Sequence, residues 1–381
     1  MNPSELDALY AFLVAAALAA LLTPLTMRFA RRVGAIDQPR ERGLSDRETP
    51  RLGGLAIFIA AAVAGAIWLP HGKPWTGILA AAALITLVGA LDDRFDFHPG
   101  VKLIGQIAAA VVAVAVGGVD IQFITLPVFG RLNFPQAGPT LTAIGLVGMM
   151  NVVNFSDGID GLAAGVCAII GVAFAVIAFS LAAKQHSGGV LAALTAGAAL
   201  GFLVHNFPPA SSFMGDAGSN LLGLLMGCIA VEGDLKTSAV VTLALPLILL
   251  AVPFLDTTFV VLKRLKYRRP VYEADQEHFH HRMARIGYSA RRTVLFFYGW
   301  TLMLAGYAVA LRFIHYSDGH GHLRAGGTIL VAALGLLVAA ASVYLVYVLE
   351  IFRWERLRRL PKPKPDERPP PDPPADARQD P

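Results

Sequence analysis

Long apolar stretches dominate this chain, and short polar segments separate them. A helix crosses the hydrocarbon core of a membrane with roughly 17 to 25 mostly apolar residues. Candidate spans, some of them short, lie at 9–27, 53–69, 76–91, 101–118, 140–155, 162–183, 189–206, 219–231, 239–262, 293–313 and 327–350. The pattern predicts an all-α polytopic integral membrane protein with about eleven transmembrane helices.

The positions of Lys and Arg predict the orientation, because loops rich in these residues stay in the cytoplasm. Alternate segments together hold 26 of the 32 Lys and Arg residues: 28–52, 92–102, 154–161, 205–219, 263–292 and 352–381. These segments are expected on the cytoplasmic side. The N-terminus is then outside and the C-terminus inside, which requires an odd number of spans, and eleven fits.

Two segments differ from the rest. Residues 119–135 alternate apolar and polar positions around Pro127 and Gly130, which predicts a small external β-hairpin. Residues 352–381 are rich in proline, which predicts a disordered cytoplasmic tail. The expected organisation is therefore a transmembrane catalytic domain over 1–351, followed by this tail.

Composition supports the membrane assignment. Of 381 residues, 55% are hydrophobic and only 15% are charged, against roughly 25% charged in a soluble protein. The two cysteines lie in apolar runs, which excludes a disulfide scaffold. The net charge of +5 reflects the topology signal, so it does not indicate nucleic-acid binding.

Ionisable residues in or beside membrane spans are costly and therefore point to function. The first such cluster is Asp92 and Asp93 at the inner end of the third span, with Lys102 following at the start of the fourth. Adjacent carboxylates can collect a divalent cation or share a proton. The alternative is an acidic turn that caps the next helix.

A second cluster follows the fifth span. Asn151, Asn154 and Asp157 are spaced by three residues, so they share a face if the helix continues, and Asp160 comes next. Neighbouring glycines let the backbone approach a ligand closely. Helix capping is the alternative, but it accounts for only one or two of these polar groups.

A third cluster, at 213–220, opens the eighth span and contains Asp216, which is flanked by glycines. This Asp could cap the helix, or it could hold a metal ion beside phosphates at the helix N-terminus.

The fourth cluster, at 275–282, lies in the longest cytoplasmic loop and includes His278, His280, His281 and Arg282. The spacing is poor for a zinc site. Arg gives bidentate phosphate contacts, so an anion-binding role is favoured over a solvated basic loop.

These clusters all fall on the predicted cytoplasmic face. Mg²⁺ is usually held by one or two carboxylates together with substrate phosphates. Phosphoryl transfer needs charge neutralisation and positioning above all. A site at the membrane implies a lipid substrate, and a cytoplasmic mouth implies a soluble donor. The residues alone therefore predict a Mg²⁺-dependent phosphotransferase that acts on a lipid, with Mn²⁺ as the alternative metal.

The motifs also resemble a known family. The runs DDRFD, NVVNFSDGIDGLAAG, FMGDAGS and HFHHR occur in the order found in the polyprenyl-phosphate N-acetylhexosamine-1-phosphate transferases. The form HFHHR is most similar to the undecaprenyl-phosphate N-acetylglucosamine-1-phosphate transferase branch. The resemblance implies transfer of a sugar-1-phosphate, most simply GlcNAc-1-phosphate, from a UDP-sugar to undecaprenyl phosphate with release of UMP. It implies a multi-pass enzyme of the bacterial plasma membrane, and it suggests a homodimer.

The same resemblance implies roles for individual residues. Asp216 would be the main Mg²⁺ ligand, with Asn154 as its partner. Asp92 would act as a base or position the lipid phosphate, supported by Asp93, and Lys102 would bind that phosphate.

Other residues would serve the donor. Asp157 and Asp160 would organise the nucleotide side of the pocket. The remaining substrate-binding candidates are Asn151, His278, His280, His281 and Arg282.

Two rival functions remain open at this point. One is the phospho-MurNAc-pentapeptide translocase branch of the same family, which makes a peptidoglycan precursor. The other is an ion-coupled transporter, although its sites usually lie near the membrane midplane between repeated halves, and no repeat is found here. The downstream glycan, such as teichoic acid or lipopolysaccharide, is not indicated by the residues.

Overall fold

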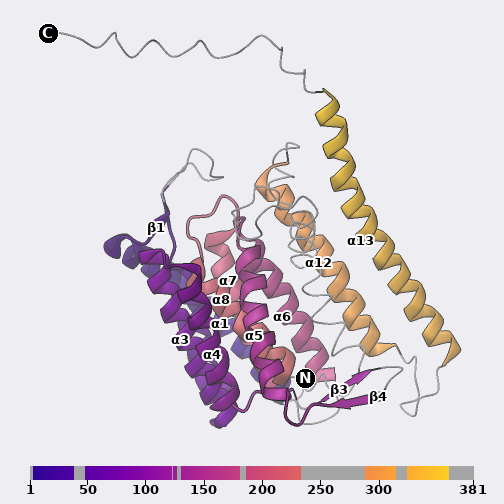
Figure 1. Ribbon diagram of the computed structural model, residues 1–381, viewed down its shortest axis with the longest axis horizontal. Helices are drawn as coiled ribbons and strands as arrows, with labels where there is room; N and C mark the ends of the chain where they lie inside the picture. Colours follow the sequence, from indigo (N-terminus) through magenta and orange to yellow (C-terminus); the bar gives the residue numbers. More distant parts are fainter. Residues whose placement is uncertain are drawn as a thin grey trace.

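The computed structural model describes residues 3–37, 48–121, 123–126, 130–180, 186–232, 288–314 and 324–359. Within these ranges the chain is mostly helical (Figure 1). The helices are α1 (Pro3–Val33), α2 (Gly53–Trp68), α3 (Lys73–Phe95), α4 (Pro99–Ala115), α5 (Gly138–Ser156), α6 (Leu162–Ser180), α7 (His186–Asn206), α8 (Gly215–Glu232), α12 (Ala290–Phe313) and α13 (Ala325–Arg359). Each coincides with one of the predicted apolar stretches. The stretch 239–262 lies outside the described residues.

Seven of the helices in the described ranges are long and apolar enough to cross a membrane: α1, α3, α5, α6, α7, α12 and the apolar part of α13. Two shorter apolar helices, α2 and α4, run beside them. The prediction of a polytopic helical membrane protein is confirmed. The total of eleven spans and the direction in which they cross stay predictions.

Two short antiparallel ladders accompany the helices. In β1 (Ile36–Asp37) and β2 (Thr49–Pro50), Ile36 pairs with Pro50; the sequence pattern did not predict this ladder. Strands β3 (Phe123–Leu126) and β4 (Gly130–Asn133) pair where the sequence predicts a hairpin. Figure 1 shows β1 at one end of the helix bundle and the β3–β4 pair at the other. Whether the β3–β4 end faces the outside stays a prediction.

The last helix differs from its predicted span at the C-terminal side. Helix α13 continues through Arg359, beyond the apolar stretch that ends at 350. The proline-rich residues 360–381 lie outside the described residues. The division of the chain into a catalytic domain and a tail therefore stays a prediction.

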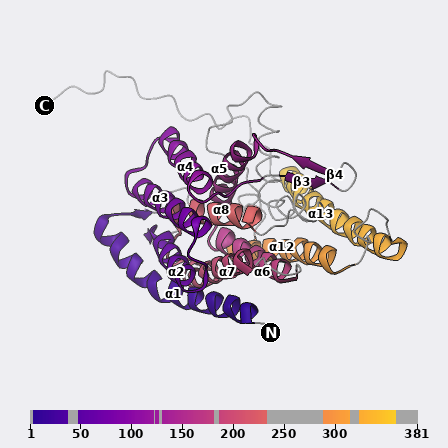
Figure 2. The ribbon, with the colours of Figure 1, turned by 90° about the horizontal axis from the view of Figure 1, so that it is seen from below.

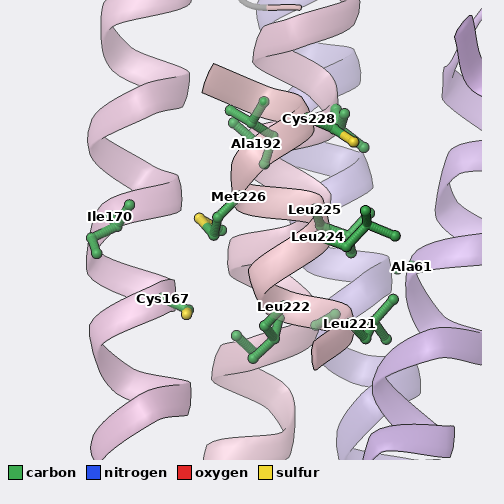
Figure 3. Close-up of a cluster of buried hydrophobic side chains, with 14 of the residues drawn as sticks. Ala61, Cys167, Ile170, Ala192, Leu221, Leu222, Leu224, Leu225, Met226 and Cys228 are labelled. Atoms are coloured by element: carbon green, nitrogen blue, oxygen red, sulfur yellow. The ribbon is translucent and has the colours of Figure 1, made fainter. Parts of the chain in front are cut away.

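Helix α8 is the centre of the bundle. It packs against α2, α3, α5, α6 and α7, and nearly all its residues after the first turn are buried. Figure 2 shows α8 inside the bundle, with α1 along the rim and α13 beyond α12. Apolar side chains of α8, among them Leu222 and Met226, lie beside Cys167 and Ile170 of α6 (Figure 3). The first turn of α8 is thus held in a fixed position by its surroundings.

Glycines allow this close packing. A Cβ atom added at Gly54 of α2 would overlap the backbone of Gly218 in α8, and one at Gly89 of α3 would overlap the backbone at Ala217. Small residues let helices in membranes approach closely, where dispersion contacts favour association. Helices α2 and α3 therefore touch the backbone of α8 at the turn that carries Asp216.

Candidate active site

Four helix ends bring the predicted polar residues together. Helix α3 ends in Asp92 and Asp93, and a three-residue turn returns the chain into α4, whose first turns carry Lys102. Asn154 lies in the last turn of α5, and Asp216 lies in the first turn of α8. These helices pack on one another, so the four ends meet at the end of the bundle opposite the β3–β4 pair.

An ion-pair network is the core of the site. Lys102 Nζ lies 2.6 Å from Asp92 Oδ2 and 2.9 Å from Asp216 Oδ2. The amide of Asn154 donates from Nδ2 to Asp216 Oδ1 at 2.9 Å and to Ser219 Oγ at 2.8 Å. The Asp92 side chain is only 4% exposed, and its other oxygen accepts from the Phe97 backbone N–H at 2.7 Å. One cation therefore joins two carboxylates from helices that are far apart in the sequence.

Asp93 has a different role from its neighbour. Its two oxygens accept from the backbone N–H groups of Asp216 at 2.8 Å and Ala217 at 3.1 Å. A carboxylate at this position satisfies free N–H groups and stabilises the positive end of the helix dipole. Gly215, the first residue of α8, has a φ of +67°, and a Cβ there would overlap the Asp93 carboxylate. Asp93 thus caps α8 from a neighbouring helix.

The segment before α8 is anchored to the first loop. The Phe213 N–H donates to the Pro50 carbonyl at 2.8 Å, and the Gly53 N–H donates to the Phe213 carbonyl at 3.0 Å. An ion pair between Arg51 and Asp37 supports this part of the first loop. Asp216 is therefore held from four sides, by α2 and its preceding loop, by α3, by α4 and by α5.

The turn between α5 and α6 carries the other two predicted carboxylates. Asp160 Oδ2 accepts from the Ala210 N–H at 2.8 Å, and Tyr298 Oη of α12 donates to the Gly161 carbonyl at 2.5 Å. Asn206 is 1% exposed and accepts from the Gly161 N–H at 2.9 Å. These contacts fix the turn to the loop that leads into α8.

Asp157 lies in this turn without such contacts. Among the described residues, no hydrogen bond to its carboxylate is found. Burial raises the pKa of Asp157 well above its usual value, and the negative charges of Asp216, Asp93 and Asp160 raise the pKa further. Burial also raises the pKa of Asp160. An acid with a raised pKa beside other carboxylates marks a place where positive charge is lacking.

The ligand types present can be compared with those that Mg²⁺ requires. In this region the carboxylates of Asp92, Asp93 and Asp216 outnumber the ammonium of Lys102, so the local charge is negative. Asp92 and Asp216 already share a cation, the Lys102 ammonium, and hard oxygen ligands are what Mg²⁺ prefers. Within the described ranges, no three His, Cys, Asp or Glu side chains form a ready-made metal cluster. The residues thus fit an ion that completes its coordination with substrate phosphates.

The structure shows where most of the predicted site residues lie. It brings together Asp92, Asp93, Lys102, Asn154 and Asp216, and it places Asp157 within electrostatic range of them. Asp160 is bonded to a loop, and Asn151 lies one helical turn from Asn154. The four loop candidates, His278, His280, His281 and Arg282, lie outside the described residues.

Sequence reasoning missed Gln106, whose amide bonds to Asn151 and Asn220. The available signal was an amide four residues after Lys102 in an otherwise apolar helix. The pattern also did not predict that the Asn206 side chain, at the end of α7, bridges the Gly161 N–H and the Ser212 carbonyl.

A bundle of apolar helices that gathers carboxylates, amides and a lysine at one end is the arrangement expected of a membrane enzyme with a charged substrate. The model of glycosyl transferase family 4 matches residues 75–234, which include most of α3 and all of α4 to α8. Together with the relatives described next, this match shows that the chain belongs to that family. The family resemblance seen in the motifs is confirmed.

Three relatives match most of this chain. The probable undecaprenyl-phosphate N-acetylglucosaminyl 1-phosphate transferase of Bacillus subtilis is 35% identical, over 76% of this chain and 80% of its own length. The decaprenyl-phosphate N-acetylglucosaminephosphotransferase of Mycobacterium tuberculosis is 34% identical, over 86% of this chain and 87% of its own. A phospho-N-acetylmuramoyl-pentapeptide-transferase of Moorella thermoacetica is 31% identical, over 79% of this chain and 97% of its own length. The protein is therefore a phosphotransferase of this family.

The close packing around α8 leads to a first testable expectation. We expect Gly89→Val to push the α8 backbone away from α3 and to lower both turnover and the melting temperature of the purified protein. Gly145→Val is a matched control, because a Cβ at Gly145 of α5 meets no atom within 4 Å. Equal behaviour of the two variants in a thermal melt and a turnover assay would contradict the expectation.

The raised pKa of Asp157 leads to a second testable expectation. The folded protein binds a proton at Asp157 more tightly than the unfolded chain does, so ionisation costs stability as pH rises above the ordinary carboxyl range. We expect Asp157→Asn to raise the melting temperature in EDTA by about 2 to 4 °C at pH 8, with a smaller gain at pH 5. A gain independent of pH, or a loss of stability at pH 8, would refute this explanation.

Proposed function

We propose that this protein transfers GlcNAc-1-phosphate from UDP-GlcNAc to undecaprenyl phosphate. An oxygen of the lipid phosphate attacks the β-phosphorus of the donor and forms the new phosphoanhydride bond. The bond from the β-phosphorus to the bridging oxygen breaks, and UMP leaves with that oxygen. The observation that carries the proposal is the Asp92–Lys102–Asp216 network at the helix ends. The names of the relatives from B. subtilis and M. tuberculosis support the lipid acceptor and the sugar.

The site residues are suited to this reaction by charge. Phosphoryl transfer requires neutralisation and alignment of phosphates more than covalent catalysis. Lys102 would pair with the lipid phosphate, and Asp92 would orient the ammonium. The second pKa of a phosphate monoester is about 6, so the acceptor is largely ionised at neutral pH. A strong general base is therefore unnecessary, and direct attack is the simpler course.

Asp216 and Asn154 are the residues that would hold Mg²⁺, with Mn²⁺ as a substitute. A divalent ion bound there would neutralise the negative charge of the donor diphosphate. Asp157 and Asp160 would organise the nucleotide side, because their turn adjoins the loop before α8. His278, His280, His281 and Arg282 are proposed to bind the donor's phosphates or sugar.

The proposal includes a place in the cell. The positive residues of the first loop and the α4 region support a site at the cytoplasmic leaflet of the plasma membrane. The reaction would be the first membrane step in making a cell-envelope glycan. A homodimer is part of the proposal by analogy with the family.

A donor screen tests the proposal. The purified protein in nanodiscs that contain undecaprenyl phosphate is given UDP-GlcNAc or UDP-MurNAc-pentapeptide with Mg²⁺, and UMP release is measured. We expect release with UDP-GlcNAc that depends on both the lipid and the metal. Release with the pentapeptide donor alone would assign the protein to the translocase branch instead.

A further inference from the structure

A second polar layer lies one helical turn deeper in the bundle than the ion-pair network. It consists of three amide side chains: Gln106 of α4, Asn151 of α5 and Asn220 of α8. Asn151 Nδ2 donates to Gln106 Oε1 at 2.8 Å, and Gln106 Nε2 donates to Asn220 Oδ1 at 2.8 Å. We call these three residues the amide platform. It ties together the three helices that carry Lys102 and its partners.

The register of the amide platform follows that of the site. Gln106 comes four residues after Lys102 on α4, and Asn220 comes four residues after Asp216 on α8. Asn151 comes three residues before Asn154 on α5. Positions three or four apart share one face of a helix. Each amide therefore supports the site residue on its own helix, from the side of the membrane interior.

The amides use their hydrogen-bonding groups within the protein. Gln106 is 5% exposed and Asn220 is 4% exposed. Asn220 Nδ2 donates to the Asp216 carbonyl at 2.8 Å, and Asn151 Nδ2 also donates to the Val147 carbonyl at 2.8 Å. Gln106 Nε2 also donates to Asn151 Oδ1 at 3.5 Å, so both amide hydrogens of Gln106 are used within the amide platform.

Stability alone is a weak reason for this arrangement. Hydrogen bonds between membrane helices contribute little on average, and a buried amide costs free energy unless it is satisfied. Apolar side chains at the three positions would pack the helices without that cost. Directional hydrogen bonds fix the distance and the rotation between two helices, whereas apolar packing does not.

We propose that Gln106, Asn151 and Asn220 are positioning residues that set the spacing of Lys102, Asn154 and Asp216 for phosphoryl transfer. This inference rests on the proposed function. It gives Asn151 a role within the protein in place of the substrate contact expected from its sequence. A displacement of about 1 Å at a reacting centre can cost about 10²-fold in rate, so loss of the platform acts on turnover rather than on substrate capture.

The experiment compares Gln106→Met with the wild-type enzyme in the UMP-release assay. Met has a similar length and volume but makes none of the amide hydrogen bonds. We expect kcat to fall by about 10- to 100-fold, while KM for UDP-GlcNAc changes by less than about twofold. Thr195→Val is the matched control, because Thr195 is equally buried in α7 and bonds only to its own helix. It should leave both constants unchanged.

A double-mutant cycle tests whether Gln106 acts through its partner. We expect Gln106→Met combined with Asn220→Leu to be no slower than the slower single variant, because both remove the same connection. The inference would be overturned if the rate losses of the two single variants multiply in the double variant, or if Gln106→Met raises KM at unchanged kcat. If Gln106→Met does not fold, Gln106→Glu takes its place, because it keeps the acceptor for Asn151 and loses the donor to Asn220. A wild-type enzyme that releases no UMP from UDP-GlcNAc would overturn the proposed function and this inference with it.

Discussion

Asp216→Asn is expected to abolish UMP release while the protein still inserts and folds. The substitution keeps the shape of the side chain and its acceptor for Asn154, but it removes the negative charge that Lys102 contacts at 2.9 Å. Removing one electrostatic group from an active site typically costs about 10²- to 10³-fold in rate. Turnover at saturating Mg²⁺ and the melting temperature are the two measurements.

The control for this variant makes the same chemical change nearby. Asp96 is exposed and has a φ of +53° at the end of α3, a conformation that Asn tolerates well. Asp96→Asn should therefore retain wild-type turnover. Near-normal activity in Asp216→Asn would remove Asp216 from the proposed metal site.

Lys102→Met is expected to separate catalysis from metal binding. The Lys102 ammonium lies between Asp92 and Asp216, where it competes with any other cation for those carboxylates. Without it, the buried carboxylate of Asp92 and the partly buried carboxylate of Asp216 lose their shared positive partner. We expect Mn²⁺ affinity, measured by electron paramagnetic resonance, to rise about tenfold, which is about 1.4 kcal/mol, while UMP release falls to background.

Lys73→Met provides the comparison, because Lys73 is exposed at the opposite end of α3 from Asp92. It should leave Mn²⁺ affinity and turnover at wild-type values. If Lys102→Met binds Mn²⁺ no more tightly than wild type, the ammonium and the metal do not share these carboxylates.

The sequence predicted the helices well because the signal for a membrane helix is strong. Twenty consecutive apolar residues have few alternatives in a bilayer, and ten of the eleven predicted stretches coincide with described helices. The ladder between Ile36 and Pro50 was missed because two-residue strands leave no alternating pattern.

The sequence indicated which residues belong to the candidate site, but it did not indicate which of them contact one another. Asp92, Lys102, Asn154 and Asp216 stood out because charged or amide groups are rare beside apolar helices. Nothing in a linear pattern shows that Asp93 caps a helix that begins 122 residues later. Such pairings depend on which helices pack together, and one sequence does not specify that.

The long sequence separation within the ion-pair network also determines the order in which the site can form. Asp92 and Lys102 are adjacent in one helical hairpin, so their pairing is available as soon as α3 and α4 have been synthesised. Asp216 follows Lys102 by 114 residues and reaches it only when α8 has entered the bundle. The early pair keeps both charges satisfied while the rest of the chain is being made. The site is therefore completed late in biosynthesis, and a chain released from the ribosome before α8 leaves that pair without its third member.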